Sequence, residues 1–236
     1  MEKTSRKTTT INNLVFYNVA VIISFINGIV IVPIYLKFID IDLLGAWLAT
    51  GSILVWLSII DPGIGTVLQQ RVAFSYGNSN IKNLSYTISS GIIISLVVSL
   101  IVLLVGLIIS DYIPSILDIS PNEIDTNELI LAFKLAILGS FFTLFSYSFV
   151  NINRGLQDST INHIVISSSQ ILSIIINIFL LFKGYGLVSI GYAQLVRGFG
   201  ALAGNSIYLF VRIYKYKIPI IFDFKYFLSF SKIFTY

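Results

Sequence analysis

Apolar residues occur along the chain in runs that are long enough to cross a membrane. A bilayer-spanning helix needs about 20 mostly apolar residues. Runs of this kind, separated by short polar connections, predict six spans at residues 14–39, 43–60, 86–110, 129–152, 161–182 and 187–211. The second run is the shortest, and we expect its helix to continue, bent, to residue 76. The pattern therefore predicts an all-α integral membrane protein in which residues 14–211 form one helical bundle.

The second span is interrupted by the stretch DPGIG. Aspartate followed by proline favours the start of a new helix, because the carboxylate accepts free backbone N–H groups and proline loses no hydrogen bond there. A continuous helix through this stretch would also exceed the thickness of the bilayer core. We predict hinge positions at Asp61, Pro62, Gly63 and Gly65 here and at Pro33 in the first span. The alternative for Asp61 is a lining residue of a cavity.

The two ends of the chain differ from the spans between them. Residues 1–13 form a short basic tail, and the apolar run behind them is too long for the hydrophobic part of a cleaved signal peptide. Residues 212–236 begin with a basic segment and continue as an aromatic, amphipathic sequence. This last part fits either a helix lying in the membrane interface or the start of a truncated seventh helix.

Composition supports a membrane location and excludes several kinds of site. The chain is 56% hydrophobic and 11% charged, whereas soluble domains carry about 25% charged residues. It has no cysteine and a single histidine, His163, which excludes thiolate and histidine-cluster metal sites. No phosphate-binding glycine loop, zinc-protease motif or serine-hydrolase motif is present. We therefore expect no catalytic residue, no metal, no cofactor and no nucleic-acid partner.

Lysine and arginine are unevenly divided between the two sides of the predicted bundle. One side holds Lys3, Arg6, Lys7, Arg71, Lys82, Arg154, Arg212, Lys215, Lys217 and Lys225, and the other holds Lys37 and Lys183. Because basic residues are retained on the cytoplasmic side, the N-terminus is predicted to be cytoplasmic. Arg71 would then lie at the cytoplasmic headgroups.

Polar side chains inside the spans indicate a cavity between the helices. Charged and amide groups are costly in lipid, so they tend to face the bundle interior or water. The predicted cavity residues are Arg197, Gln194, Asn205, Asn27, Asn177, Gln170 and Lys134. Arg197 lies near mid-span, and no acid lies in the middle of any predicted span. A cationic cavity of this kind suits an anionic passenger, such as a phosphate-bearing lipid headgroup.

Each of these residues also has a structural interpretation. The amide side chains can serve as interhelical hydrogen bonds, Lys134 can extend to the outer interface, and Arg197 can form a buried ion pair. Gly200 and Gly204 in the sixth span form a GxxxG pattern, which predicts close approach to a neighbouring helix.

Residues Pro33–Gly77 resemble the N-terminal signature of polysaccharide exporters and O-antigen flippases of the multidrug/oligosaccharidyl-lipid/polysaccharide superfamily. The matching pieces, in order, are Pro33, Tyr35-Leu36, Gly45-x-Trp47, Asp61-x-Gly63-x-Gly65 and Ala73-x-x-Tyr76-Gly77 after Arg71. The NRGLQDS turn at Asn153–Ser159 and the glycine-rich sixth span are also similar. Asp40 departs from the pattern, which has glycine in that turn.

The resemblance implies a 12-helix transporter made of two six-helix bundles around a central cavity. Such a protein flips undecaprenyl-diphosphate-linked oligosaccharide across the bacterial inner membrane by alternating access, alongside membrane lipids and the glycan polymerase machinery. This sequence would supply the first bundle, with Arg197 attracting the diphosphate. The resemblance also favours a truncated seventh helix over an interfacial one at residues 212–236.

Three other functions compete with a flippase. The chain could be an inactive or partner-dependent half-transporter, or a drug or cation exporter of the same superfamily. A membrane phosphotransferase would need several acids spaced along one helix to hold a divalent metal. Asp61 stands without such a cluster, so the sequence argues against this enzyme.

Overall fold

The computed structural model describes Val15, Asn18, Val21, Ile22, Phe25 and residues 28–58, 64–119 and 125–231. In this part of the chain every regular element is a helix. Gly28–Phe38 is helical and precedes α2 (Ile41–Ser58), α3 (Ile64–Gly77), α4 (Ile81–Ser110), α5 (Ile113–Ile116), α6 (Thr126–Gly155), α7 (Thr160–Phe182), α8 (Val188–Lys215) and α9 (Phe224–Ser231). The predicted all-α class is confirmed for these residues.

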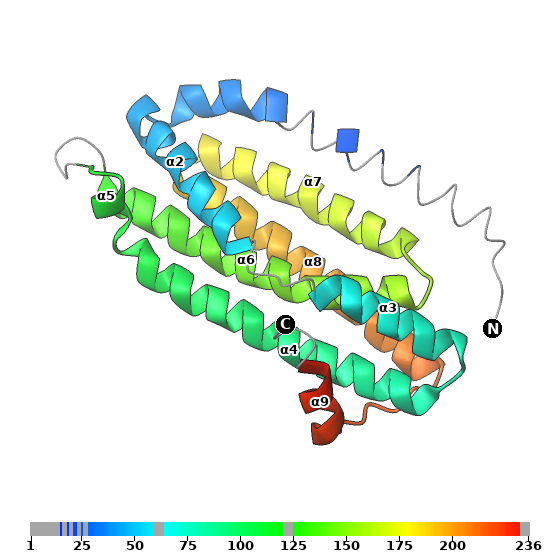
Figure 1. Cartoon of the computed structure of the whole chain (residues 1–236). Coiled ribbons are helices and arrows are strands. Elements are labelled where there is room, and N and C mark those ends of the chain that lie inside the picture. The colour runs from blue at the N-terminus through cyan, green and yellow to red at the C-terminus, as the bar shows by residue number, and fades with distance from the viewer. Residues whose placement is uncertain are drawn as a thin grey trace.

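The long helices lie side by side and alternate in direction. Helix α6 lies between α4 and α8, and α7 packs on the far side of α8 (Figure 1). Helices α2 and α3 are shorter and pack on α6 near its two opposite ends (Figure 1). Helix α6 therefore contacts α2, α3, α4 and α8, and is the central element of the described fold.

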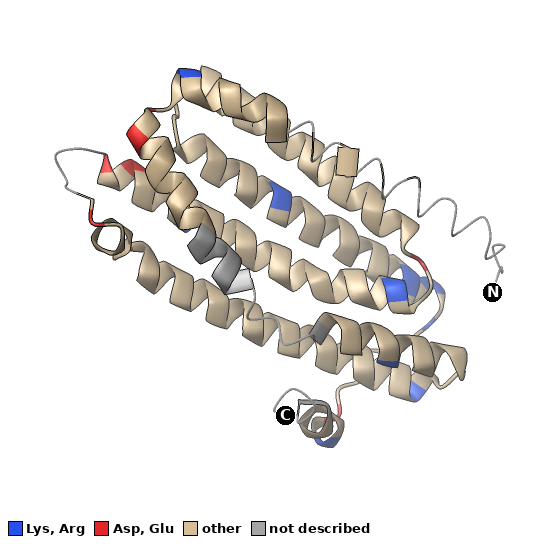
Figure 2. Ribbon diagram, turned by 45° about the horizontal axis from the view of Figure 1, so that its top comes forward, with Lys and Arg blue, Asp and Glu red and all other residues tan. Residues whose placement is uncertain are grey.

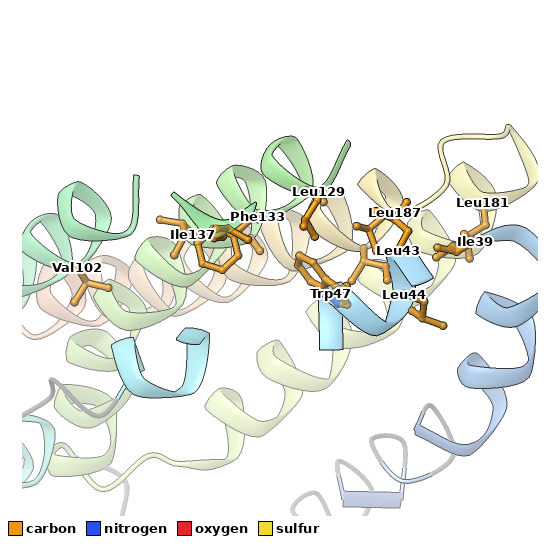
Figure 3. Close-up of a cluster of buried hydrophobic side chains, with 14 residues drawn as sticks. Ile39, Leu43, Leu44, Trp47, Val102, Leu129, Phe133, Ile137, Leu181 and Leu187 are labelled. Atoms are coloured by element: carbon orange, nitrogen blue, oxygen red, sulfur yellow. The ribbon is translucent and has the colours of Figure 1, made fainter. Parts of the chain in front are cut away.

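Two clusters of buried hydrophobic side chains fix α2 and α3 on α6. In the first, Trp47 of α2 packs with Leu129 and Phe133 near the start of α6 (Figure 3). In the second, the fully buried Leu68 and Val72 of α3 pack with side chains of α4 and of the C-terminal half of α6. Each half of the second span is thus held on α6 by its own buried cluster. The two halves therefore need not form one straight helix.

The predicted bend coincides with the boundary between α2 and α3. Helix α2 ends at Ser58 and α3 begins at Ile64. The predicted hinge residues Asp61, Pro62 and Gly63 lie outside the described residues. Gly65 is described, and it is buried in the first turn of α3.

Three of the described helices are long and apolar enough to cross a membrane, namely α4, α6 and α7. Helix α8 corresponds to the sixth predicted span but does not meet this criterion among the described residues. Its sequence carries Gln194, Arg197 and Asn205 together with several glycines, which lower its hydropathy. Because α8 packs between α6 and α7, less of its surface has to be apolar than in a helix exposed to lipid.

Charged residues gather at opposite ends of the helices (Figure 2). Acidic residues lie mainly at the end that carries α5, and most lysines and arginines lie at the opposite end. We call these the acidic end and the basic end. The basic end includes Arg71 in α3, Lys82 in the first turn of α4, Arg154 in the last turn of α6, Arg212 and Lys215 in the last turn of α8, and Lys217 just after it.

Several helices extend beyond the predicted spans because polar caps start them outside the apolar runs. Helix α4 begins at Ile81 rather than Tyr86, after Asn80, whose side chain accepts a hydrogen bond from the Asn83 N–H. Helix α6 begins at Thr126 rather than Leu129, after Asp125, which accepts from two backbone N–H groups. Hydropathy locates the lipid-facing part of a helix, whereas caps locate its first turn.

Asp40 caps α2 and explains why the turn departs from the expected glycine. Its Oδ1 accepts hydrogen bonds from the backbone N–H groups of Asp42, at 2.9 Å, and Leu43, at 3.3 Å. We expect Asp40→Ala to lower the free energy of unfolding by about 0.5–2 kcal/mol, as is typical of a lost N-cap. Thermal unfolding in detergent would measure this loss. Asp40→Asn keeps an acceptor, so equal destabilisation by both substitutions would contradict a capping role.

Candidate functional site

Arg197 is the charged side chain farthest from the ends of α8. It lies about 14 Å along the helix from Val188, at 1.5 Å per residue. Its Nη2 donates a hydrogen bond of 2.5 Å to Oε1 of Gln194, one turn earlier. Among the described residues no Asp or Glu pairs with Arg197, because the ion pairs found there are Lys134–Asp111 and Arg212–Asp158. The guanidinium is therefore held by a neutral amide, and no described carboxylate compensates its charge.

Glycines place the Arg197 turn of α8 directly against α6. A Cβ added at Gly139 of α6 would lie 2.5 Å from the Gln194 carbonyl oxygen, and one added at Gly191 would lie 2.6 Å from the Ala132 carbonyl oxygen. A Cβ at Gly198 would overlap the Gly139 carbonyl oxygen. The two backbones are in contact on this side, so no side chain larger than hydrogen fits between them.

The GxxxG pattern of α8 faces α7. A Cβ at Gly200 would lie 2.7 Å from Oγ of Ser169, and one at Gly204 would lie 2.5 Å from Cγ1 of Val165. The predicted close approach at Gly200 and Gly204 is confirmed. Helix α8 thus packs closely against both α6 and α7, because glycines lie on the two faces that contact them.

A buried asparagine cluster joins α6, α7 and α8 toward the basic end. Asn153 donates from Nδ2 to Oδ1 of Asn162, at 3.3 Å, and to the Asn205 carbonyl oxygen, at 3.4 Å. Nδ2 of Asn162 donates to the Val150 carbonyl oxygen at 3.0 Å. Asn153, Asn162 and Asn205 are all fully buried. Asn205, predicted to line the cavity, therefore lies inside a helix interface.

Sequence reasoning missed Asn153 and Asn162. Both lie near the NRGLQDS turn, where an asparagine is indistinguishable from an ordinary loop residue. Their spacing around a short connection between two spans was the available signal, because antiparallel neighbours bring such positions together.

Removing one member of this cluster should destabilise the bundle. Asn162→Ala deletes the hydrogen bond to the Val150 carbonyl and a partner of Asn153, and polar contacts between membrane helices contribute about 0.5–2 kcal/mol each. We expect a lower midpoint of thermal unfolding in detergent. Gln170→Ala on the same helix, at a half-buried position, serves as the control. An effect no larger than that of Gln170→Ala would contradict the role of the cluster.

A second polar contact links the Gly28–Phe38 helix to α7. Nδ2 of Asn177 donates to the Tyr35 hydroxyl at 2.5 Å, and the rings of Phe38 and Phe182 meet edge to face at 5.1 Å. Pro33 lies within this helix at an exposed position. Asn177 is buried and serves as an interhelical contact in this structure. The predicted cavity residue Asn27 lies outside the described residues.

The remaining predicted residues lie apart from Arg197. Lys134 forms a 2.7 Å ion pair with Asp111 at the acidic end, which agrees with its alternative role at the outer interface. Arg71 is half-buried in α3, at the basic end. Gly65 packs against the side chain of Asn151 on α6. Of the predicted cavity residues that the structure describes, only Arg197 and Gln194 are joined by a hydrogen bond.

The described residues contain no group of three or more His, Asp or Glu side chains that could hold a metal ion. What remains as a site is a single cationic side chain, hydrogen-bonded to a neutral amide, on a helix that packs closely between two others. This arrangement can attract an anion. It offers no nucleophile or acid–base pair for catalysis.

The fold and this site define the protein as an all-helical, multi-pass membrane protein with a cationic interior position. The chain belongs to the MatE family, whose profile matches residues 18–179, more than half of its length. MatE proteins are membrane transporters of the multidrug/oligosaccharidyl-lipid/polysaccharide superfamily, and not enzymes. No curated protein and no solved structure matched the chain.

Proposed function

We propose that this chain takes part in moving a polyprenyl-diphosphate-linked oligosaccharide across the bacterial inner membrane, as one six-helix bundle of a two-bundle transporter that works by alternating access. Arg197 is the observation that carries the proposal. An arginine fork can bind two phosphate oxygens at once, and its attraction for them grows in a medium of low dielectric constant. Gln194 holds the fork in place.

The distribution of acids favours an anionic passenger over a cationic drug. A cation exporter needs carboxylates at membrane depth, because such a passenger must be paired where water is scarce. The described acids lie near the ends of helices or in connections, as with Asp40, Asp111, Glu128 and Asp158. An exporter of drugs or cations, which belongs to the same superfamily, is the second candidate and would depend on Asp61, outside the described residues.

The charge difference between the two ends supports an orientation for the transporter. Because lysine and arginine are retained on the cytoplasmic side, we place the basic end and the N-terminus in the cytoplasm. The diphosphate group would then enter from the basic end. Other proteins of the glycan assembly machinery would act before and after this step. A half-transporter that requires a second chain fits the same geometry.

Binding separates these candidates even if one bundle alone does not transport. The purified chain would be titrated with polyprenyl diphosphate, with the matching polyprenyl alcohol and with the lipophilic cation tetraphenylphosphonium, and binding would be followed by tryptophan fluorescence. We expect the diphosphate to bind at least tenfold more tightly than the alcohol, and the cation to bind weakly. Equal binding of diphosphate and alcohol would contradict the proposed passenger. Preferential binding of the cation would favour the drug exporter.

A further inference from the structure

A cavity of about 150 Å³ lies at the basic end, away from Arg197, and two of its lining residues, Leu84 and Ile218, also belong to the second buried cluster. It is enclosed by the end of α3, the start of α4 and the segment that follows α8. The residues that line it include hydroxyl-bearing and aliphatic ones, namely Ser75, Tyr76, Ser79, Ile81, Leu84, Tyr216 and Ile218. The cavity thus offers hydrogen-bonding groups beside an apolar floor.

Three exposed lysines are adjacent in the sequence to residues that line this cavity. Lys82 follows the lining residue Ile81, and Lys215 and Lys217 flank the lining residue Tyr216. Within the described part of the chain none of the three forms an ion pair. The Nζ atoms of Lys82 and Lys215 lie 5.8 and 5.9 Å from the ring centres of Tyr86 and Tyr216, which is within cation–π distance.

The acids near the cavity are already engaged. Oδ2 of Asp158 accepts a hydrogen bond from the Tyr208 hydroxyl and lies 3.8 Å from Nη1 of Arg212. Asp223 caps α9, where its Oδ1 accepts the Tyr226 N–H at 3.0 Å. Neither acid forms an ion pair with Lys82, Lys215 or Lys217 in the described part of the chain, so these lysines can attract an anion from outside the chain.

The wall formed by the segment after α8 is fixed to α4 by specific hydrogen bonds. The Ser85 hydroxyl donates to the Pro219 carbonyl and accepts the Ile221 N–H, and the Thr87 and Tyr226 hydroxyls lie 2.7 Å apart. The same segment exposes Ile220 and Phe222 to the surroundings. Exposed apolar side chains next to lysines are typical of a protein surface that meets lipid headgroups.

We propose that this cavity binds the headgroup of an anionic phospholipid from the leaflet at the basic end. The lysines and the hydroxyl groups would contact the phosphate, and the glycerol and first acyl carbons would lie on Ile81 and Ile218. A free phosphate ion would leave this apolar floor uncovered, so a lipid is the better occupant. The bound lipid would join the α3–α4 turn to the α8–α9 connection. This site does not depend on the passenger that the transporter carries.

Native mass spectrometry of the full chain in detergent, with added phosphatidylglycerol or phosphatidylcholine, tests this inference. We expect phosphatidylglycerol to bind preferentially. The double substitution Lys215→Gln and Lys217→Gln should weaken its binding at least tenfold, since each basic residue near a lipid surface contributes roughly fivefold. The matched control is Lys37→Gln with Lys183→Gln, which removes the same charge at the acidic end and should leave binding unchanged. Equal losses in the two double variants, or equal binding of the two lipids, would overturn the proposal.

Two further measurements separate a cavity site from general attraction and from a free anion. Ile81→Trp, at an exposed lining position, fills the cavity and keeps every lysine, so we expect it to abolish the preference for phosphatidylglycerol. Retained preference in a folded Ile81→Trp protein, verified by circular dichroism, would show that the cavity is not the site. Inorganic phosphate should not displace the lipid, and displacement at millimolar concentration would identify a free-anion site instead.

Discussion

Replacing Arg197 by glutamine is expected to weaken the binding of polyprenyl diphosphate by about 10- to 100-fold. Hydrogen bonds to charged groups contribute about 1.5–3 kcal/mol each, and the other cations of α8, Arg212 and Lys215, lie in its last turn. Arg197→Lys keeps the charge but loses the planar fork, so its loss should be smaller. Titration with polyprenyl diphosphate, followed by tryptophan fluorescence, measures both variants.

Lys134→Gln provides the matched control, because it removes one positive charge from the neighbouring helix at the acidic end. Lys134 is partly exposed and already paired with Asp111, so its loss should change diphosphate binding less than threefold, in line with the small contribution of exposed ion pairs. If Arg197→Gln and Lys134→Gln weaken binding equally, the diphosphate does not contact Arg197. If neither substitution affects binding while the folded fraction stays constant, Arg197 does not bind the diphosphate.

Replacing Gly198 by valine should prevent normal packing of α8 on α6. Its Cβ would overlap the Gly139 carbonyl oxygen, and a backbone atom cannot move aside as a flexible side chain can. Inserting extra methyl groups into a packed interface destabilises by about 1–3 kcal/mol, and a forced backbone shift adds to this loss. We expect a strong fall in the yield of folded protein, measured by size-exclusion chromatography in detergent and by thermal unfolding.

Gly45→Ala is the control for this substitution. Gly45 lies in α2, and nothing lies within 4 Å of a Cβ built there. Alanine should therefore be tolerated and should stabilise the helix by up to about 1 kcal/mol, since glycine is a poor helix former. Wild-type stability in Gly198→Val, or comparable destabilisation in Gly45→Ala, would contradict the close packing of α6 and α8.

Much of the fold followed from hydropathy. The predicted positions of the third to sixth spans correspond to α4, α6, α7 and α8, whereas the predicted bend at residues 61–63 lies outside the described residues. The ends were less accurate, because the apolar run records where lipid lies and not where the first hydrogen-bonded turn forms. Asp125 and Asn80 set those turns, and both lie outside the apolar runs.

The polar residues show which contacts the helical pattern of the sequence does not predict. A stripe on a helical wheel indicates the face of the helix on which a side chain lies, but not the residue of another helix that it contacts. Asn205 and Arg197 share a stripe on α8, yet Asn205 is fully buried against Asn153 of α6. Arg197, two turns away, contacts only Gln194 of its own helix among the hydrogen bonds found.

The sequence by itself determined that this chain is an all-helical membrane protein with basic and acidic ends and with a cationic residue in its sixth long helix. These properties depend on local composition and on the cost of placing polar groups in lipid, which any arrangement of the helices must obey. Only the tertiary structure decided which polar groups face one another. The backbones of α6 and α8 are in contact at Gly139 and Gly198, and three helices converge on Asn153. These contacts join residues that are far apart in the chain, and no local sequence pattern specifies them.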